Sequence, residues 1–434
     1  MRIAILGYSL EGRSSYEYFK AQGGHDITIC DADESIDVPE GARSALGAGY
    51  LDDLDQFDLL VRTAGLPPSA ILEKSPGVVS KITSNLNEFL KACPTGNIIG
   101  ITGTKGKGTT STLVAKMLEA AGKQVGLGGN IGVPPLEMLP ELTPDSWVVL
   151  ELSSFQLMDI GRSPHIGVCL MVVPEHLDWH ARTDEYFGAK ANLFAKQSSE
   201  DIAIYFADNK TSEKIAAGGN GRKIPYFAAP GAVVEDGAVR IDGKDICKTD
   251  ELKLLGRHNW QNVCAAVTTV WQVTQDTEAL RSVLTGFGGI EHRLELVREL
   301  DGVRYYDDSY GTTPETATVA IEAFEKEPVI AILGGRPKGI PFDDLASFIS
   351  RRSNVKQVIA IGETGPEIAE LLRNNGFGRI TTGANDMAGI VRQARELAEP
   401  GDVVLLSTAN TSFDMFKNYK QRGEIFAKAV KSLS

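Results

Sequence analysis

Short apolar runs recur along the whole chain, and each ends in a glycine or a polar turn. Near the start these runs cover residues 2–6, 26–30 and 57–61. Apolar runs of this length, separated by stretches with helical spacing, are typical of the buried parallel strands of α/β domains. The pattern therefore predicts a small Rossmann-like α/β domain over residues 1–92.

The middle of the chain repeats this alternation around a glycine-rich stretch, GITGTKGKGTT, at residues 100–110. An apolar strand is expected to end just before the stretch, and apolar residues with helical spacing follow it at 113–121. The other elements expected here are strands over 147–150 and 166–172 and a helix over 186–196. A strand, a glycine turn and a helix in this order predict a P-loop-type central domain over residues 93–297.

Two further regions complete the expected architecture. Residues 201–255 alternate in short runs between glycine turns, which predicts β-hairpins added to one side of the central domain. After residue 298 the apolar runs lie at 303–306, 329–333, 355–361 and 403–406, with helical stretches between them. We therefore expect a third, Rossmann-like α/β domain over 298–434 with a mostly parallel sheet.

Composition narrows the class of protein. The 434 residues are 42% hydrophobic and carry a formal net charge of -13, which argues against a nucleic-acid partner and against binding to acidic membranes. The chain opens on a strand pattern, and no apolar run approaches membrane-spanning length, so we expect a soluble cytoplasmic protein. Its five cysteines form no CxxC pair and are expected to be buried free thiols.

The glycine-rich stretch has the composition of a phosphate cradle. Glycines let backbone N–H groups approach phosphate oxygens, the helix start adds a positive dipole, and Lys107 can reach the β- and γ-phosphates. The strict P-loop spacing is not met, because Ile101 stands at the first glycine position and Gly108 replaces the hydroxyl after the lysine. Thr109 is then the nearest hydroxyl for a magnesium ion. The alternative is a plain glycine turn before a helix.

Other polar residues follow the strands of the central domain. Glu151 comes directly after the strand over 147–150, where an open α/β sheet presents a magnesium-binding acid. Asn130 lies in a second glycine-rich loop, and His176 follows another strand between two acids. The histidine could be structural or could serve a metal or phosphate, and Lys190 taken alone would be a solvated lysine.

The first turn of the chain, GYSLEGRS at residues 7–14, resembles a Rossmann turn with Ser9 at the middle glycine position. Asp31 ends the next strand, where a ribose-binding carboxylate would lie. These features favour a domain that binds a nucleotide-like group. A purely structural lobe and a nicotinamide site remain as alternatives.

Taken together, these motifs give the chain a family resemblance. It carries, in this order, GITGTKGKGTT, GGNIG, ELSSFQL, EHLD, GRHNWQN, EHRLE, DDS, LGG-x-x-K and a C-terminal string that begins LLS and ends RG. In this order the strings resemble the Mur ligases, ATP-dependent amide-forming enzymes of peptidoglycan synthesis. ELSSFQL and the last string resemble most the branch that adds D-glutamate to UDP-N-acetylmuramoyl-L-alanine.

The resemblance implies catalytic roles for four residues. Lys107 matches the ATP phosphate lysine, and Glu151 and His176 match residues of a magnesium site. Lys190 matches a lysine that CO2 carbamylates, which would convert a cation into an anionic group beside Mg2+. The implied cofactors are ATP and two magnesium ions. The remaining ATP-binding positions are Gly103, Thr104, Lys105, Gly106, Gly108, Thr109, Thr110, Asn259, Asn262, His292, Arg293 and Asp308.

The resemblance also implies two substrate sites. Asn130 and Ser153 match positions near the muramoyl substrate, and Thr63 sits where the family contacts the uridine nucleotide. We place the rest of the nucleotide site at the first turn, with Ser9, Leu10 and Asp31. The positions that match the incoming amino-acid site, expected to take glutamate, are Thr312, Lys338, Ser412, Phe413 and Tyr419.

Several residues depart from the family pattern. Gly108 replaces a serine or threonine, Tyr310 replaces a lysine usual in the glutamate pocket, and Arg336 replaces an acid common there. Met171 and Glu175 replace an asparagine and an aspartate ahead of His176, and Asp33 stands where arginine is frequent. These changes leave open whether D- or L-glutamate is preferred, and how the metal is held.

The resemblance implies two-step chemistry in a monomeric enzyme. The substrate carboxylate attacks the γ-phosphorus of ATP to give an acyl phosphate, and the amine of the amino acid then displaces phosphate. Two other classes remain as alternatives. One is a ligase like folylpolyglutamate synthetase, whose chains begin close to the P-loop, and the other is a non-catalytic nucleotide-binding regulator on the same fold.

Overall fold

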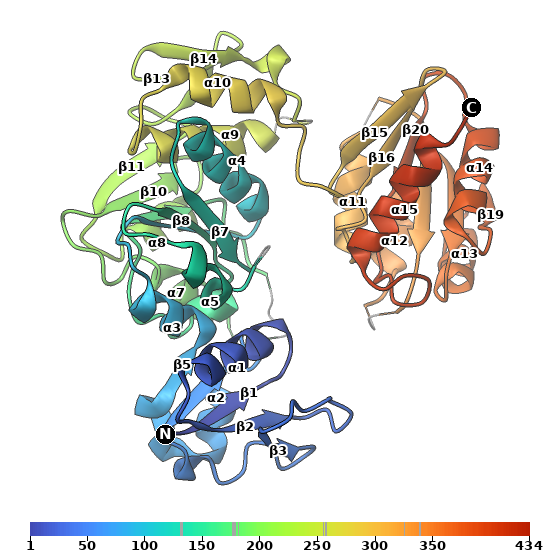
Figure 1. Cartoon of the computed structure of the whole chain (residues 1–434). Helices are drawn as coiled ribbons and strands as arrows, with labels where there is room; N and C mark the ends of the chain where they lie inside the picture. Colours follow the sequence, from blue (N-terminus) through green and yellow to red (C-terminus); the bar gives the residue numbers. More distant parts are fainter. Residues whose placement is uncertain are drawn as a thin grey trace. The chain divides into compact units, whose positions relative to one another are not determined.

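The computed structural model describes residues 1–130, 133–175, 179–180, 182–254, 256, 258–324, 326–337 and 340–434 (Figure 1). The chain divides into two compact units. The first comprises Met1–Lys253 and Arg257–Phe287, and the second is chiefly Gly288–Ser434. Nowhere in the described part of the chain is a helix both long enough and apolar enough to cross a bilayer.

The first unit begins with a five-stranded parallel sheet. Its spatial order is β3 (Arg43–Leu46), β2 (Asp26–Asp31), β1 (Arg2–Leu6), β4 (Leu59–Arg62) and β5 (Ile82–Ser84). The helices that accompany these strands are α1 (Leu10–Gln22), α2 (Pro68–Lys74) and α3 (Asn85–Ala92). β1 is buried almost throughout because it lies between β2 and β4, as its apolar run predicts.

A six-stranded parallel sheet forms the centre of the same unit. Its order is β11 (Arg222–Tyr226), β10 (Ile202–Phe206), β9 (Ile166–Cys169), β6 (Ile98–Thr102), β8 (Trp147–Glu151) and β7 (Val125–Gly129). The helices of this part of the chain are α4 (Lys107–Ala120), α5 (Pro135–Met138), α6 (Ser154–Leu157), α7 (Thr183–Ala191), α8 (Lys210–Ala216), α9 (His258–Trp271) and α10 (Thr277–Gly286). The chain moves from β6 past β8 to β7 and later crosses to β9, so the carboxyl end of β6 lies where ligands bind in open α/β sheets.

Three expectations about elements in this unit need correction. Residues 201–255 are not all hairpins, because β10 and β11 extend the parallel sheet and only β12 (Val233–Glu235), β13 (Ala238–Ile241) and β14 (Lys244–Lys248) form an antiparallel meander. The strand expected over 166–172 ends at Cys169, and the helix expected over 186–196 is α7. Short runs between glycine turns do not show whether a strand pairs in a hairpin or joins a parallel sheet.

A buried ion pair joins the first sheet to the central one. Arg62, the last residue of β4, has a fully buried side chain that donates through Nε to Asp159 Oδ2 at 2.8 Å and through a terminal nitrogen to Asp159 Oδ1 at 2.5 Å. It also donates to the carbonyl oxygens of Phe155, Thr63 and Leu66. The guanidinium therefore ties the end of β4 to the segment that follows α6.

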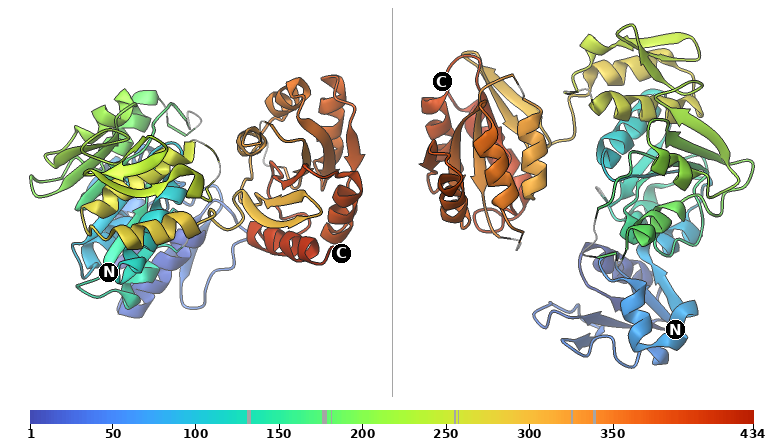
Figure 2. Two further views of the ribbon diagram at one scale, coloured as in Figure 1. Left: turned by 90° about the horizontal axis from the view of Figure 1, so that it is seen from above. Right: turned by 180° about the vertical axis from the view of Figure 1, so that it is seen from behind.

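The second unit is a sheet with helices on both faces. Its order is β15 (Glu295–Leu300), β16 (Val303–Asp307), β20 (Val403–Leu406), β17 (Val329–Gly334), β18 (Val355–Ile361) and β19 (Ile380–Thr382), with only β15 antiparallel to its neighbour. One core layer packs α11 (Pro314–Glu322), α12 (Asp343–Arg351) and α13 (Gly365–Asn374) against the sheet. The other packs α14 (Met387–Leu397) and α15 (Tyr419–Lys431) (Figures 1 and 2). The mostly parallel sheet expected from the sequence is confirmed.

Candidate active site

The stretch Gly100–Thr110 leads from β6 into α4 as a glycine turn. Gly103 has φ +151° and Gly106 has φ +88°, backbone conformations that favour glycine. A Cβ on Gly106 would lie 2.2 Å from Asn262 Oδ1, so the absence of a side chain lets α9 approach the turn. Asn262 in turn donates to Asn259 Oδ1 at 2.8 Å. The structure thus brings both asparagines, expected from the sequence at an ATP site, to the glycine turn.

Two lysines share one carbonyl oxygen of this turn. Lys107 Nζ donates to Gly103 O at 3.0 Å and to Thr104 O at 3.1 Å, and Lys190 Nζ donates to Gly103 O at 2.9 Å. Lys107 is the first residue of α4, whereas Lys190 comes from α7, more than eighty residues later. Two ammonium groups are therefore held close together at the carboxyl end of β6.

Lys190 is buried and its environment disfavours its charge. Its side chain is almost inaccessible, and Nζ lies 4.5 Å from the centre of the Tyr186 ring. Burial and the Lys107 charge lower the pKa of Lys190 to about 7. A neutral, nucleophilic amine is thus accessible near physiological pH, which a solvated lysine would not provide.

Glu151 ends β8 beside the glycine turn. Its carboxylate is almost fully buried and accepts a hydrogen bond from Asn130 Nδ2 at 2.8 Å. The Asn130 backbone N–H donates to Glu151 O at 2.8 Å, so the second glycine-rich loop is tied to the same strand end. The hydroxyl-bearing Thr109 and Thr110 lie in the first turn of α4 and are largely buried. His176, the remaining expected metal residue, lies outside the described residues.

Ser153 connects this strand end to the first sheet. Its hydroxyl caps α6 by accepting from Gln156 N at 3.2 Å, and the side-chain amide of Gln156 donates to Glu11 Oε1 at 2.7 Å. The other oxygen of Glu11 accepts from Ala64 N at 2.8 Å. A chain of hydrogen bonds therefore runs from the end of β8 to the turn that follows β4.

The first turn of the chain is stabilised from within. Asp31 accepts from Tyr8 N at 2.6 Å and from Asp33 N at 3.0 Å, so its carboxylate holds the backbone around Ser9. The Thr63 hydroxyl lies under this turn, where it donates to Leu6 O at 3.2 Å. Leu10, by contrast, is 62% exposed.

A second group of expected residues gathers at the carboxyl edge of the sheet in the second unit. The Tyr419 ring meets the Tyr310 ring edge-on at 5.3 Å and the His292 ring at 6.4 Å. The Arg293 guanidinium lies 5.7 Å from the centre of the Tyr310 ring. Tyr310, which stands where the family has lysine, thus lies within a cluster of aromatic rings and a cation.

Asp308 lies just behind this cluster. It accepts from Ser407 Oγ at 2.6 Å and from Leu294 N at 3.2 Å, and burial raises its pKa to about 7. Ser412 is buried, whereas Phe413 is 59% exposed and Thr312 is partly buried. Lys338, the cation expected in the amino-acid site, lies outside the described residues.

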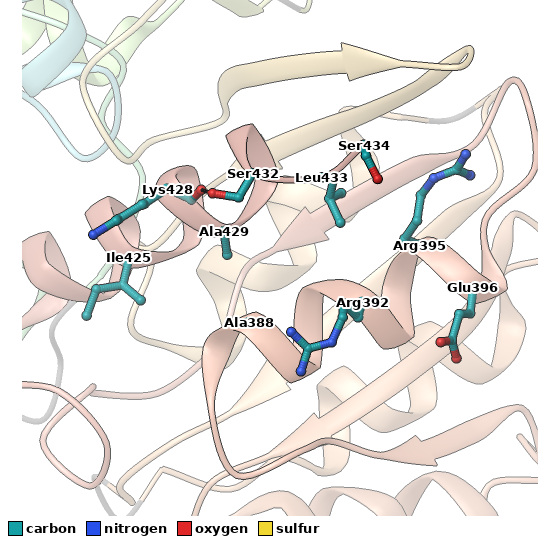
Figure 3. A pocket seen from close by; sticks show the side chains of 10 residues that line it. All are labelled: Ala388, Arg392, Arg395, Glu396, Ile425, Lys428, Ala429, Ser432, Leu433 and Ser434. Atoms are coloured by element: carbon teal, nitrogen blue, oxygen red, sulfur yellow. Dashed lines mark hydrogen bonds between the residues drawn. The ribbon is translucent and has the colours of Figure 1, made fainter.

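A groove in this unit contains none of the expected site residues. It has a volume of about 500 Å³ and lies between α14 and α15 (Figure 3). Arg392, Arg395 and Lys428 line it beside the chain end at Ser434, and Arg395 pairs with Asp301 at 2.6 Å. Lys428 and Ser432 of this groove also line the pocket that contains His292 and Asp307, so the groove adjoins the second cluster.

The glycine turn, the lysine at the helix start and the acid on the adjacent strand define a site of the P-loop type. Family models agree with this class. One described as the Mur ligase middle domain matches residues 101–270, and one described as the Mur ligase, glutamate ligase domain matches residues 292–410. The chain belongs to the Mur ligase family, which confirms the resemblance found in its sequence.

Curated relatives match over their whole length. The chain is 38% identical to the UDP-N-acetylmuramoylalanine–D-glutamate ligase of Symbiobacterium thermophilum, and the match covers 100% of this chain and 98% of the relative. Ligases of the same name from Acetivibrio thermocellus and Geobacillus kaustophilus are 36% identical, and the matches cover 100% of this chain and 96% and 98% of those relatives.

Solved structures of related ligases share the fold. The MurF ligase from Thermotoga maritima in complex with ADP has a TM-score of 0.61 and 18% identity, and the match covers 99% of this chain and 94% of that one. The MurC ligase of the same organism has a TM-score of 0.57 and 17% identity, with 100% and 99% covered. The Mur ligase α/β fold expected from the sequence is confirmed.

The sequence analysis missed several residues that build these clusters. Arg62 and Asp159 were not singled out, and neither were Glu11, Tyr186 or Asp307. Asp307 could have been found, because it is the first of two acids after an expected strand. Acids in that position are typical of binding sites in α/β sheets. Nothing in the sequence pairs Arg62 with a residue 97 positions later.

Proposed function

We propose that this protein is an ATP-dependent ligase that joins D-glutamate to the carboxylate of UDP-N-acetylmuramoyl-L-alanine in the cytoplasm, during synthesis of peptidoglycan precursors. The observation that carries the proposal is the P-loop-type site at the end of β6, with Lys107 and Lys190 on one carbonyl and Glu151 on the next strand. Full-length similarity to D-glutamate ligases supports the choice of substrates.

The first step brings two anions together, and the site is built to offset their repulsion. Lys107 would contact the phosphates of ATP, and the backbone N–H groups at the start of α4 would cradle them. Gly103, Thr104, Lys105, Gly106, Gly108, Thr109 and Thr110 supply that backbone, with Asn259 and Asn262 beside it. The substrate carboxylate would then attack the γ-phosphorus to give the acyl phosphate and ADP.

We further propose that Lys190 carries a carbamate. Its neutral amine would attack CO2, form an N–C bond and release a proton, which leaves a negative charge where an ammonium stood. Because burial and Lys107 disfavour the ammonium, the modification replaces repulsion between two cations by attraction between Lys107 and an anion. The lowered pKa of Lys190 supports this proposal, because only the neutral amine reacts with CO2.

We propose that magnesium binds at the carboxyl end of β6, where hard oxygen donors suit this ion. Glu151, Thr109 and a carbamate on Lys190 would hold the metal together with His176, and two ions are expected. The metal supplies charge neutralisation between the phosphates and the substrate carboxylate. Asn130 holds the Glu151 carboxylate in place, so this acid is preorganised before any ligand arrives.

Substrate positions follow the three proposed domains, 1–92, 93–297 and 298–434. Ser9, Leu10, Asp31 and Thr63 would form the nucleotide end of the UDP-sugar site, and Asn130 and Ser153 the end near the reacting carboxylate. His292, Arg293 and Asp308 would complete the ATP site. The incoming glutamate would bind Thr312, Lys338, Ser412, Phe413 and Tyr419.

The test is ligation with a panel of amino acids. Purified protein, ATP, Mg2+ and UDP-N-acetylmuramoyl-L-alanine are combined with D-glutamate, L-glutamate, D-aspartate or L-lysine, and amide product is quantified. The proposal predicts the highest kcat/KM for D-glutamate. If L-glutamate is preferred, the dicarboxylate pocket stands and the stereochemical assignment fails. A preference for L-lysine, or no amide with any acceptor, contradicts the proposal.

A further inference from the structure

His292 is held in an unusual backbone conformation by neighbouring groups. Its φ of +62° lies in the left-handed region, which is unfavourable for a residue other than glycine. Its N–H donates to Glu295 Oε2 at 2.9 Å, and its carbonyl accepts from Tyr310 N at 2.8 Å. These two backbone hydrogen bonds therefore fix the direction in which the His292 side chain leaves the main chain.

That side chain is bonded to a buried acid. His292 Nδ1 lies 2.7 Å from Oδ2 of Asp307, the last residue of β16, whose side chain is 1% exposed. The second oxygen of Asp307 accepts from Ser309 N at 2.8 Å. Arg422 fixes Ser309 by donating to its hydroxyl and its carbonyl, each at 2.8 Å. Asp307 therefore has no freedom to turn away from the imidazole.

Helix α15 closes over the pair with a glycine. A Cβ built on Gly423 would lie 2.1 Å from His292 Nδ1 and 2.5 Å from Asp307 Oδ2. Glycine is less favourable than alanine inside a helix, so its presence here needs a reason. The reason is space for the imidazole and the carboxylate.

We propose that Asp307 is a positioning residue, which orients His292 and fixes its tautomer so that Nε2 is presented to the ATP phosphates. This inference rests on the proposed function, in which His292 contacts ATP. An ionised carboxylate can only accept, so Nδ1 carries the hydrogen. Nε2 is then an acceptor on the neutral ring and a cationic donor on the protonated ring, the form that binds phosphate oxygens.

The electrostatic surroundings support the protonated form. The hydrogen bond to Asp307 raises the pKa of His292, against the opposing effect of burial. The acids close to the ring therefore keep it protonated to a higher pH than is usual for histidine. The charged and titratable groups around the ring come from three parts of the unit. They are Glu291, Arg293 and Glu295 beside it, Asp307 at the end of β16 with Asp308 and Tyr310 after it, and Tyr419, Arg422, Glu424, Lys428 and Lys431 on α15.

A metal ion is the other occupant to consider at this place. Ligand atoms of His292, Glu295 and Asp307 lie within 4.8 Å of one another. However, the contact between imidazole and carboxylate already has the length of a hydrogen bond, and the α15 backbone fills the adjoining space at Gly423. A hydrogen-bonded pair accounts for the geometry without an ion.

The experiment compares Asp307→Asn with Asp301→Asn, which removes an exposed acid from the neighbouring turn. Histidine Cε1–H resonances are titrated by NMR in the full chain, and a His292→Gln variant assigns the signal. We expect the His292 pKa to fall in Asp307→Asn only. We also expect kcat/KM for ATP to fall about 10–100-fold at alkaline pH, and the deficit to shrink as the pH is lowered and the ring becomes protonated in both proteins.

A second variant keeps the test decisive if Asp307→Asn folds poorly. A change from glycine to alanine ordinarily stabilises a helix. Gly423→Ala should instead displace the imidazole and lower kcat/KM for ATP as Asp307→Asn does. An unchanged His292 titration in both variants, or a deficit that does not depend on pH, overturns the positioning role. A wild-type protein that turns over no substrate would instead show that the proposed function has failed, and this inference with it.

Discussion

Arg62 and Lys190 are both cations with almost inaccessible side chains, and they lie in the same unit. Arg62 donates to both oxygens of Asp159 and to three backbone carbonyls. Lys190 donates to Gly103 O, a carbonyl it shares with Lys107, and lies on the Tyr186 ring. One cation is paired with a carboxylate. The other faces a second cation, whose effect on the Lys190 pKa outweighs the opposing charge of Glu175.

This difference separates a structural charge from a chemical one. A buried guanidinium surrounded by acceptors is stable in one state, because its desolvation is offset by hydrogen bonds and an ion pair. A buried ammonium beside another cation is disfavoured, and the group can respond by losing its proton or by changing its chemistry. We therefore infer that Arg62 has a structural role, in which it links the two sheets, and that Lys190 is a reactive amine.

Removing the reactive amine should give the largest effect. Lys190→Ala is expected to lower kcat about 10²–10³-fold, because the anionic group at the phosphate site is lost. Small carboxylates such as acetate should restore part of the activity. Lys196→Ala, which changes an exposed lysine close in sequence, should retain activity. Full activity of Lys190→Ala without added carboxylate would contradict the account.

Removing Lys107, which shares the Gly103 carbonyl with Lys190, should give the next largest loss of activity. Lys107→Ala should lower ligation about a hundredfold through lost electrostatic stabilisation of the transferring phosphoryl group. It should also raise the pKa of Lys190, because one of the two causes that depress it has been removed. Steady-state kinetics measure the first effect, and Lys116→Ala on the exposed side of α4 is the control. Near-normal ligation would mean that the phosphate site is misassigned.

Removing the carboxylate that pairs with Arg62 should lower the free energy of unfolding. Asp159→Asn leaves the Arg62 charge buried without its carboxylate, which is expected to cost about 3 kcal/mol of the free energy of unfolding. The double variant Arg62→Met, Asp159→Leu should recover much of this loss, because no charge remains buried. Urea unfolding measures both. Equal stability of the single and double variants would show that the pair is not coupled.

The pH dependence of stability gives a further contrast, which is read as a slope. In CO2-free buffer, Lys190 has a pKa of about 7 in the folded chain, against 10.5 as its reference value. Between these values the unfolded chain binds the extra proton, so the free energy of unfolding should rise with pH, by up to about 1.4 kcal/mol per unit. Lys190→Met should lose this slope and Lys196→Met should keep it. Parallel curves for the wild type and Lys190→Met would rule out a depressed pKa.

Local sequence patterns predicted the glycine turn, the Lys107 helix start and the position of Glu151 correctly, because each depends on neighbouring residues. The pairing of Lys190 with Gly103 O was beyond such patterns, since it depends on how α7 packs against β6. Taken alone, Lys190 read as a solvated lysine, and only the family resemblance marked it. The extent of the hairpin region was predicted wrongly, because the sequence does not show that β10 and β11 pair with distant strands of the parallel sheet.

The transfer of oxygen between substrate and phosphate tests the central claim most directly. UDP-N-acetylmuramoyl-L-alanine labelled with ¹⁸O in its free carboxylate is turned over with ATP, Mg2+ and D-glutamate, and the released phosphate is analysed by mass spectrometry. An acyl-phosphate ligase must leave one labelled oxygen in phosphate for each amide formed. Amide formation with unlabelled phosphate, or ATP hydrolysis without amide, would contradict the account.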